Sequence, residues 1–224
     1  MAAVTMTAPE RRPRRGAVAP VQESGAGVDG NERLTAATAV ALILLLAAEG
    51  VTILLLRPLF SAHVFIGMLL IPPVALKLGS TGWRFFRYYR GSREYVRRGP
   101  PLLPLRLLAP LVVASTIGVF ATGVALLITG PAGGIVLGLH KASFVVWLVA
   151  TGIHVLAHVQ KLPALVLGDW RIARRRSERA VPGSFKRQLL LAGSIVAGAI
   201  LAIATIRYAQ PWLHWLATHQ SHDG

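Results

Sequence analysis

Hydrophobic residues in this chain gather in long blocks, and polar and charged residues gather between them. Five blocks reach the roughly 20 residues that a helix needs to cross the hydrocarbon core of a bilayer. These blocks are residues 34–56, 62–83, 107–129, 135–159 and 189–209. The pattern therefore predicts an all-α membrane protein with a five-helix transmembrane domain over residues 34–209.

The two ends of the chain lack such a block. Residues 1–33 are polar, rich in Pro, Gly and Ala, and show no apolar periodicity, which predicts a disordered basic tail. The first apolar block is too long for the apolar core of a signal peptide, so we expect it to be a retained helix. Residues 210–224 are expected to form a C-terminal tail outside the membrane.

Composition supports the membrane assignment, and the distribution of charge predicts the orientation of the chain in the membrane. Only 15% of the residues are charged and 54% are hydrophobic, whereas soluble domains carry about 25% charge. Of the 24 Lys and Arg residues, 21 lie in the N-terminal tail and in the segments 77–106 and 161–187. The positive-inside rule then predicts a cytoplasmic N-terminus and an external C-terminus.

Charge and cysteine content exclude several classes of function. The net charge is +15, but the cations lie beside the membrane without a nucleic-acid-binding motif, so anionic lipid is the expected partner and nucleic acid is not. The chain has no cysteine. This excludes disulfides, thiolate metal sites, cysteine nucleophiles and covalent haem attachment.

Histidines inside the apolar blocks are the first candidates for function, because ionisable groups are costly within a membrane. His63 and His140 lie toward the outer ends of the second and fourth helices. Each precedes a cation of its inner flank, Arg84 or Lys161, by 21 residues. We therefore expect these helices to be neighbours, with two imidazoles at one depth that can bind a haem iron from opposite sides. The alternative is a pair of buried, hydrogen-bonded histidines.

A second haem has less support in the sequence. His154 follows His140 by 14 residues, which is about 21 Å along the same helix face. The matching position on the second helix is Lys77, so one haem is favoured over two. His154 and His158 share a face, where they could bind a quinone, form a second site, pass protons or bind a metal. They could equally satisfy loop carbonyls or lipid phosphates.

Three further charged residues could support a haem. Glu49 on the first helix could accept a hydrogen bond from an imidazole and fix its tautomer, or it could pair with a cation or stay protonated. Arg57 and Lys141 lie next to the proposed ligands at the outer edge, where haem propionates would need cations. Interfacial snorkelling explains these two cations equally well.

Several segments together resemble small bacterial membrane proteins of the cytochrome b561 and cytochrome b type, including the membrane anchor subunits of molybdopterin oxidoreductases. They are His63-Val-Phe-Ile-Gly67, the basic and aromatic run from Lys77 to Tyr89, Gly99-Pro-Pro101 with Arg106, His140-Lys-Ala-Ser-Phe144 with Trp147, and His154-Val-Leu-Ala-His158. The resemblance covers roughly residues 34–209. It implies a haem-binding helical bundle in which His63 and His140 are the axial ligands. The chain departs from it where His154 lacks a histidine opposite.

The resemblance implies an electron-transfer subunit rather than a stand-alone enzyme. Such a subunit would carry haem b in the cytoplasmic membrane of a bacterium and pass electrons between the quinone pool and a partner redox protein of a respiratory chain. The alternative function is a haem-free membrane anchor or small transporter whose histidines handle protons or a metal. The odd number of spans and the absence of an inverted repeat disfavour a transporter.

Overall fold

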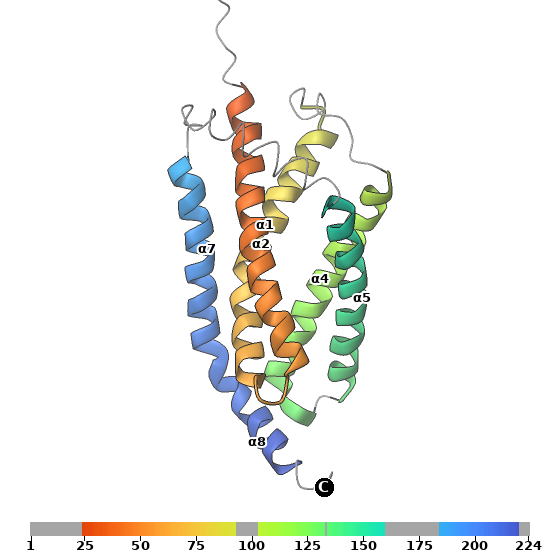
Figure 1. Ribbon diagram of the computed structural model, residues 1–224, viewed down its shortest axis with the longest axis vertical. Helices are drawn as coiled ribbons and strands as arrows, with labels where there is room; N and C mark the ends of the chain where they lie inside the picture. Colours follow the sequence, from red (N-terminus) through yellow and green to blue (C-terminus); the bar gives the residue numbers. More distant parts are fainter. Residues whose placement is uncertain (1–23, 93–102, 133, 160–183, 220–224) are drawn as a thin grey trace, which may run out of the picture.

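The computed structural model describes residues 24–92, 103–132, 134–159 and 184–219, and all regular structure in these ranges is helical. The long helices are α1 (Ser24–Leu54), α2 (Phe60–Tyr89), α4 (Leu103–Thr129), α5 (Gly134–Val159) and α7 (Ser184–Thr205) (Figure 1). The short ones are η1 (Gly130–Ala132), η2 (Ile206–Ala209) and α8 (Gln210–Thr218). Within the described ranges, five segments are long and apolar enough to cross a membrane, which agrees with the expected number of spans.

The surface of the bundle suits a lipid environment. Large apolar side chains point outward from every long helix; Leu54 and Ile135, for example, are 84% and 83% exposed. In water such a surface would be a strong aggregation hazard, whereas lipid tails solvate it. The outward face therefore supports a multi-pass membrane protein in contact with lipid.

Helix α1 begins earlier than the sequence predicts. Its first turn is at Ser24, whereas a disordered tail was expected up to residue 33; residues 1–23 lie outside the described part of the chain. Side chains on both sides of the predicted start hold α1 against α2. Asn31 Nδ2 donates to the Ser80 carbonyl oxygen at 3.1 Å, and Thr35 Oγ1 donates to Ser80 Oγ at 3.1 Å. These contacts stabilise a polar segment that lacks an apolar face.

Helix α2 lies between α1 and α7, and its approach to α7 depends on a glycine. A Cβ atom at Gly198 would collide with the backbone carbonyl oxygen of Leu69. Small residues permit this kind of close helix contact in membranes. Beside it lies the buried apolar core, which consists of Met68, Leu127, Ala202 and Ala209.

Helices α4 and α5 form a second group. They pack mainly against each other, α4 touches α2 over a short stretch, and α5 hardly touches α2 directly (Figure 1). The two groups meet at the end of the bundle where η1, η2 and α8 lie, which we call the α8 end. The second and fourth spans, α2 and α5, therefore belong to different groups instead of packing closely on each other.

The segment expected to be an external tail is folded against this end. Trp212 of α8 is buried, and its Nε1 donates a hydrogen bond to the Leu126 carbonyl oxygen of α4 at 3.0 Å. Its ring lies 6.1 Å from that of Phe60 at the start of α2. Helix α8 thus contacts both helix groups. Residues 220–224 lie outside the described part of the chain.

Candidate functional site

A cavity of about 400 Å³ lies at the α8 end, between the two helix groups. Small-molecule and cofactor sites commonly have volumes of about 300–1,000 Å³. Its walls are contributed by α1, α2, α4, α5 and α8 and are mostly apolar. The aromatic residues in them are Phe60, Phe120, Phe144, Trp147, Trp212 and Trp215.

Both histidines expected to be ligands line this one cavity. His63 comes from the first turn of α2 and His140 from the second turn of α5. Because α2 and α5 belong to different helix groups, the two imidazoles reach the cavity from separate walls. The structure therefore brings together the pair that the matched depths predicted.

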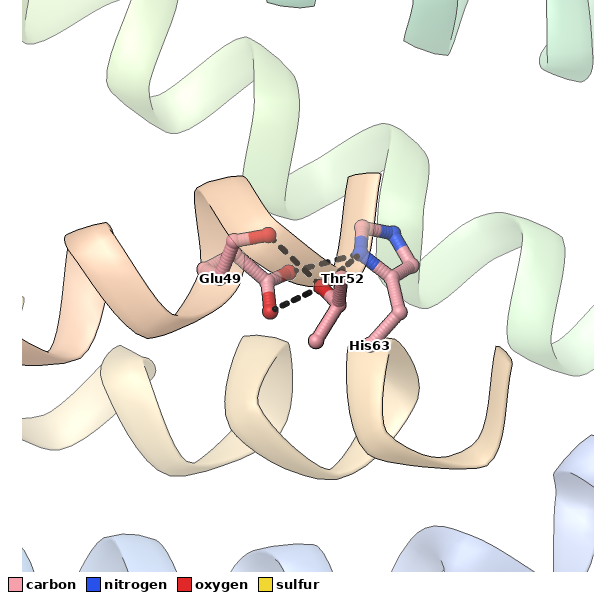
Figure 2. Close-up of polar contacts among 3 residues, drawn as sticks. All are labelled: Glu49, Thr52 and His63. Atoms are coloured by element: carbon pink, nitrogen blue, oxygen red, sulfur yellow. Dashed lines mark hydrogen bonds and ion pairs between the residues drawn. The ribbon is translucent and has the colours of Figure 1, made fainter. Parts of the chain in front are cut away.

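The imidazole of His63 is held by α1. Its Nδ1 lies 2.9 Å from Glu49 Oε1 and 3.3 Å from Thr52 Oγ1 (Figure 2). Thr52 donates its single proton either to the Glu49 carbonyl oxygen at 2.6 Å or to Glu49 Oε2 at 3.1 Å, so in both cases its oxygen is an acceptor toward the ring. With a carboxylate and a hydroxyl acceptor on one side, Nδ1 carries the proton and Nε2 keeps its lone pair.

The imidazole of His140 is held in the same way by α4. Its Nδ1 lies 3.0 Å from Thr122 Oγ1, and Thr122 donates to the Gly118 carbonyl oxygen at 2.7 Å. Thr122 therefore accepts the proton from Nδ1, and Nε2 again keeps its lone pair. A hydrogen bond that fixes the far nitrogen is the usual support for a metal-binding histidine.

Two glycines lie beside these rings, and one of them keeps space for an imidazole. Gly67 and Gly123 both line the cavity. A Cβ atom at Gly123 would lie 3.3 Å from His140 Cε1, and one at Gly67 would lie 3.5 Å from Glu49 Oε1. A Cβ at Gly123 would crowd the ring of His140, whereas one at Gly67 would be in ordinary van der Waals contact with the carboxylate that holds His63.

The charged residues expected near the site are also at the cavity. Glu49 is buried in its wall, whereas Arg57 and Lys141 line it and are exposed to the surroundings. Arg57 is in the connection between α1 and α2, and Lys141 follows His140 directly. An exposed cation at the edge of an apolar cavity can pair with an acidic group of a bound ligand or extend to the membrane interface.

The inner histidines are apart from this site. His154 is half-buried on α5 and is not among the residues that line the cavity. His158 is on the same helix, but its side chain lies outside the described residues. On α2, Lys77 Nζ donates to the Thr35 carbonyl oxygen of α1 at 2.8 Å. Lys77 is thus directed to α1.

Sequence reasoning missed the residues that complete the site. Thr52 and Thr122 orient the two rings, and Trp212 and Trp215 close the α8 end of the cavity. Thr52 follows Glu49 by three residues, one helical turn, which was a usable signal. The partner of His140 comes from another helix, so no local spacing could reveal Thr122.

The donor set limits what the cavity can hold. No three His, Asp or Glu side chains in the described ranges come together as ligands of a metal ion. Two imidazoles with free Nε2 atoms suit a metal whose other ligands come from a flat macrocycle, and the apolar aromatic walls suit its faces. The residues present therefore fit haem b better than a bare metal ion.

Comparisons with known proteins add nothing to this geometry. No protein-family model matches the chain, and neither a curated protein nor a solved structure matches it.

Proposed function

We propose that this protein is a b-type cytochrome subunit that binds one haem b between His63 and His140. The observation that supports this most directly is that both imidazoles, from different helix groups, line one apolar cavity with Nδ1 hydrogen-bonded. When bound, haem supplies reversible one-electron redox chemistry. The chain positions the cofactor and excludes water from it.

Each part of the site has a role in this proposal. His63 and His140 would hold the iron, Glu49, Thr52 and Thr122 would fix the imidazole tautomers, and Gly123 leaves room for the ring of His140. Arg57 and Lys141 would pair with the propionates at the cavity edge. The count of one haem is supported by Lys77, which is directed to α1 at the position where a second ligand would be needed.

We further propose that the subunit is in the cytoplasmic membrane of a bacterium and passes electrons between the quinone pool and a partner redox protein. His154 and His158 on α5 are the candidates for contact with a quinone. The haem-free alternative, an anchor or transporter that handles protons or a metal, is less well supported because it leaves the apolar cavity between the two imidazoles without a role.

An absorption spectrum of the purified protein tests the haem proposal. We expect a Soret band, a sharp α band after reduction with dithionite, and a ratio of one haem per chain in the pyridine haemochrome assay. A colourless protein from cells supplied with haem precursor would disprove the proposal. A ratio of two would show that the inner position also binds haem.

Gly123→Ala tests whether the glycine keeps room for the ligand pair. The new Cβ would press on His140 Cε1 at 3.3 Å. Overpacking of this kind costs about 1–3 kcal/mol, so we expect haem affinity to fall about tenfold. Haem titration of the apoprotein measures it. Gly138→Ala on α5, where a Cβ meets nothing within 4 Å, is the control and should bind normally.

The proposed orientation, with a cytoplasmic N-terminus, rests on the charge distribution. Reporter fusions at Gly130 and at the C-terminus should be active outside the membrane, and a fusion at Arg98 inside, because the basic segments remain in the cytoplasm. The α8 end, with the cavity, would then face outward. An internal C-terminal reporter would overturn this orientation.

A further inference from the structure

The two imidazoles at the cavity are held by chemically different partners. His63 Nδ1 is 2.9 Å from a carboxylate oxygen of Glu49, whereas His140 Nδ1 is 3.0 Å from the hydroxyl of Thr122. The first partner can carry a full negative charge and the second is neutral. Glu49 is buried, so its interaction with the ring is only weakly screened by solvent.

The Glu49 carboxylate is built into this position. Thr52 can donate its one proton to the Glu49 backbone carbonyl oxygen at 2.6 Å or to Glu49 Oε2 at 3.1 Å, and His63 Nδ1 contacts Oε1, so both carboxylate oxygens have a polar neighbour (Figure 2). Across the helix interface a Cβ at Gly67 would lie 3.5 Å from Oε1, at ordinary van der Waals contact, so α2 passes close to the carboxylate at this glycine. The carboxylate is therefore fixed at Nδ1.

A carboxylate that accepts the Nδ1 proton makes the imidazole a stronger electron donor to a metal at Nε2. A stronger donor, and a nearby negative charge, both stabilise the oxidised form of an iron centre, which is the more positive one. Hydrogen bonding to axial ligands is one of the means by which a protein sets haem potential. The neutral hydroxyl at His140 has a much smaller effect of the same kind.

We propose that Glu49 is a positioning residue that makes His63 the stronger of two unequal axial ligands and thereby holds the reduction potential of the site low. This inference rests on the proposed haem function. The reduction potential is then set chiefly by one carboxylate on α1. The ligand on the α1 side donates more electron density to the iron than the ligand on the α4 side.

Potentiometric titration of matched variants tests the proposal. Glu49→Gln keeps the size of the side chain and an acceptor oxygen but removes the charge. We expect its midpoint potential to rise by at least 59 mV, which is a tenfold change in the reduction equilibrium of a one-electron couple. Thr122→Val, which removes the neutral partner of His140, should shift the potential by less than half as much.

The outcomes separate the two proposals. An unmodified protein without haem would overturn both, whereas haem-loaded Glu49→Gln with an unchanged potential would overturn this one alone. Equal shifts in the two variants would also overturn it. If Glu49→Gln does not accumulate, the near-infrared charge-transfer band of the oxidised unmodified protein decides. Anionic character on His63 should move this band to higher energy than in a haem with two ordinary imidazoles, and a coincident band would contradict the proposal.

Discussion

Replacement of His63 or His140 with alanine is expected to leave the purified protein without haem, whereas replacement of His154 is expected to leave the haem in place. His63 and His140 line the same cavity, and each would supply one bond to the iron. His154 is 14 residues beyond His140, about 21 Å along the helix, and cannot substitute for a lost ligand. The pyridine haemochrome ratio of each variant measures the effect.

A rescue experiment distinguishes loss of a ligand from loss of the fold. Imidazole added to His140→Ala should enter the space left by the side chain and restore a low-spin haem spectrum, because it replaces the missing Nε2 donor. The circular dichroism spectrum of haem-free His140→Ala should still be that of a helical protein. Loss of haem in His154→Ala alone would show that the haem lies in the inner half of the bundle. If His154→Ala retains its haem, slower reduction of that haem by a quinol would support the quinone role of His154.

Gly198→Ala is expected to destabilise the bundle by about 3 kcal/mol or more, because its Cβ would collide with the Leu69 backbone. Backbone atoms cannot rotate away as a side chain can, so α2 and α7 must separate. Gly193→Ala on the same helix is the control, since its Cβ meets nothing within 4 Å. That variant should be unchanged or slightly more stable, by up to about 1 kcal/mol, because alanine favours helix. Denaturation in SDS followed by circular dichroism compares the two, and equal stability would contradict the close contact.

Hydropathy was sufficient to predict the long helices. A span of apolar residues in lipid has to form a helix to satisfy its own backbone, so length and composition carry nearly all the information. The ends of the helices were harder to predict. In the extension of α1 before residue 34, Asn31 donates a hydrogen bond to Ser80 on another helix, and no local pattern encodes such a contact.

The parts of the candidate site that depend on depth in the membrane could be predicted from the sequence. The parts that depend on how the helices pack could not. His63 and His140 could be paired because helix rise converts residue number into height. Glu49 was expected as a possible partner of a ring, and the structure places it on His63. Hydropathy alone could not divide the helices into two groups, because apolar faces in lipid look alike whichever neighbour they contact. For that reason the cavity between the groups was not foreseen.

The position of α8 also bears on how the protein matures. Trp212, Trp215 and Leu216 form part of the cavity wall, and all three are translated after α7, the last of the long helices. Domains begin to fold while synthesis continues, with N-terminal parts first. The histidine-bearing walls can therefore assemble in the membrane before the wall from α8 exists. A ligand that enters through this end has its opportunity before α8 docks on Leu126, and the docked helix then slows its escape. Chains that end before Gln210 would accordingly acquire a ligand readily and retain it poorly.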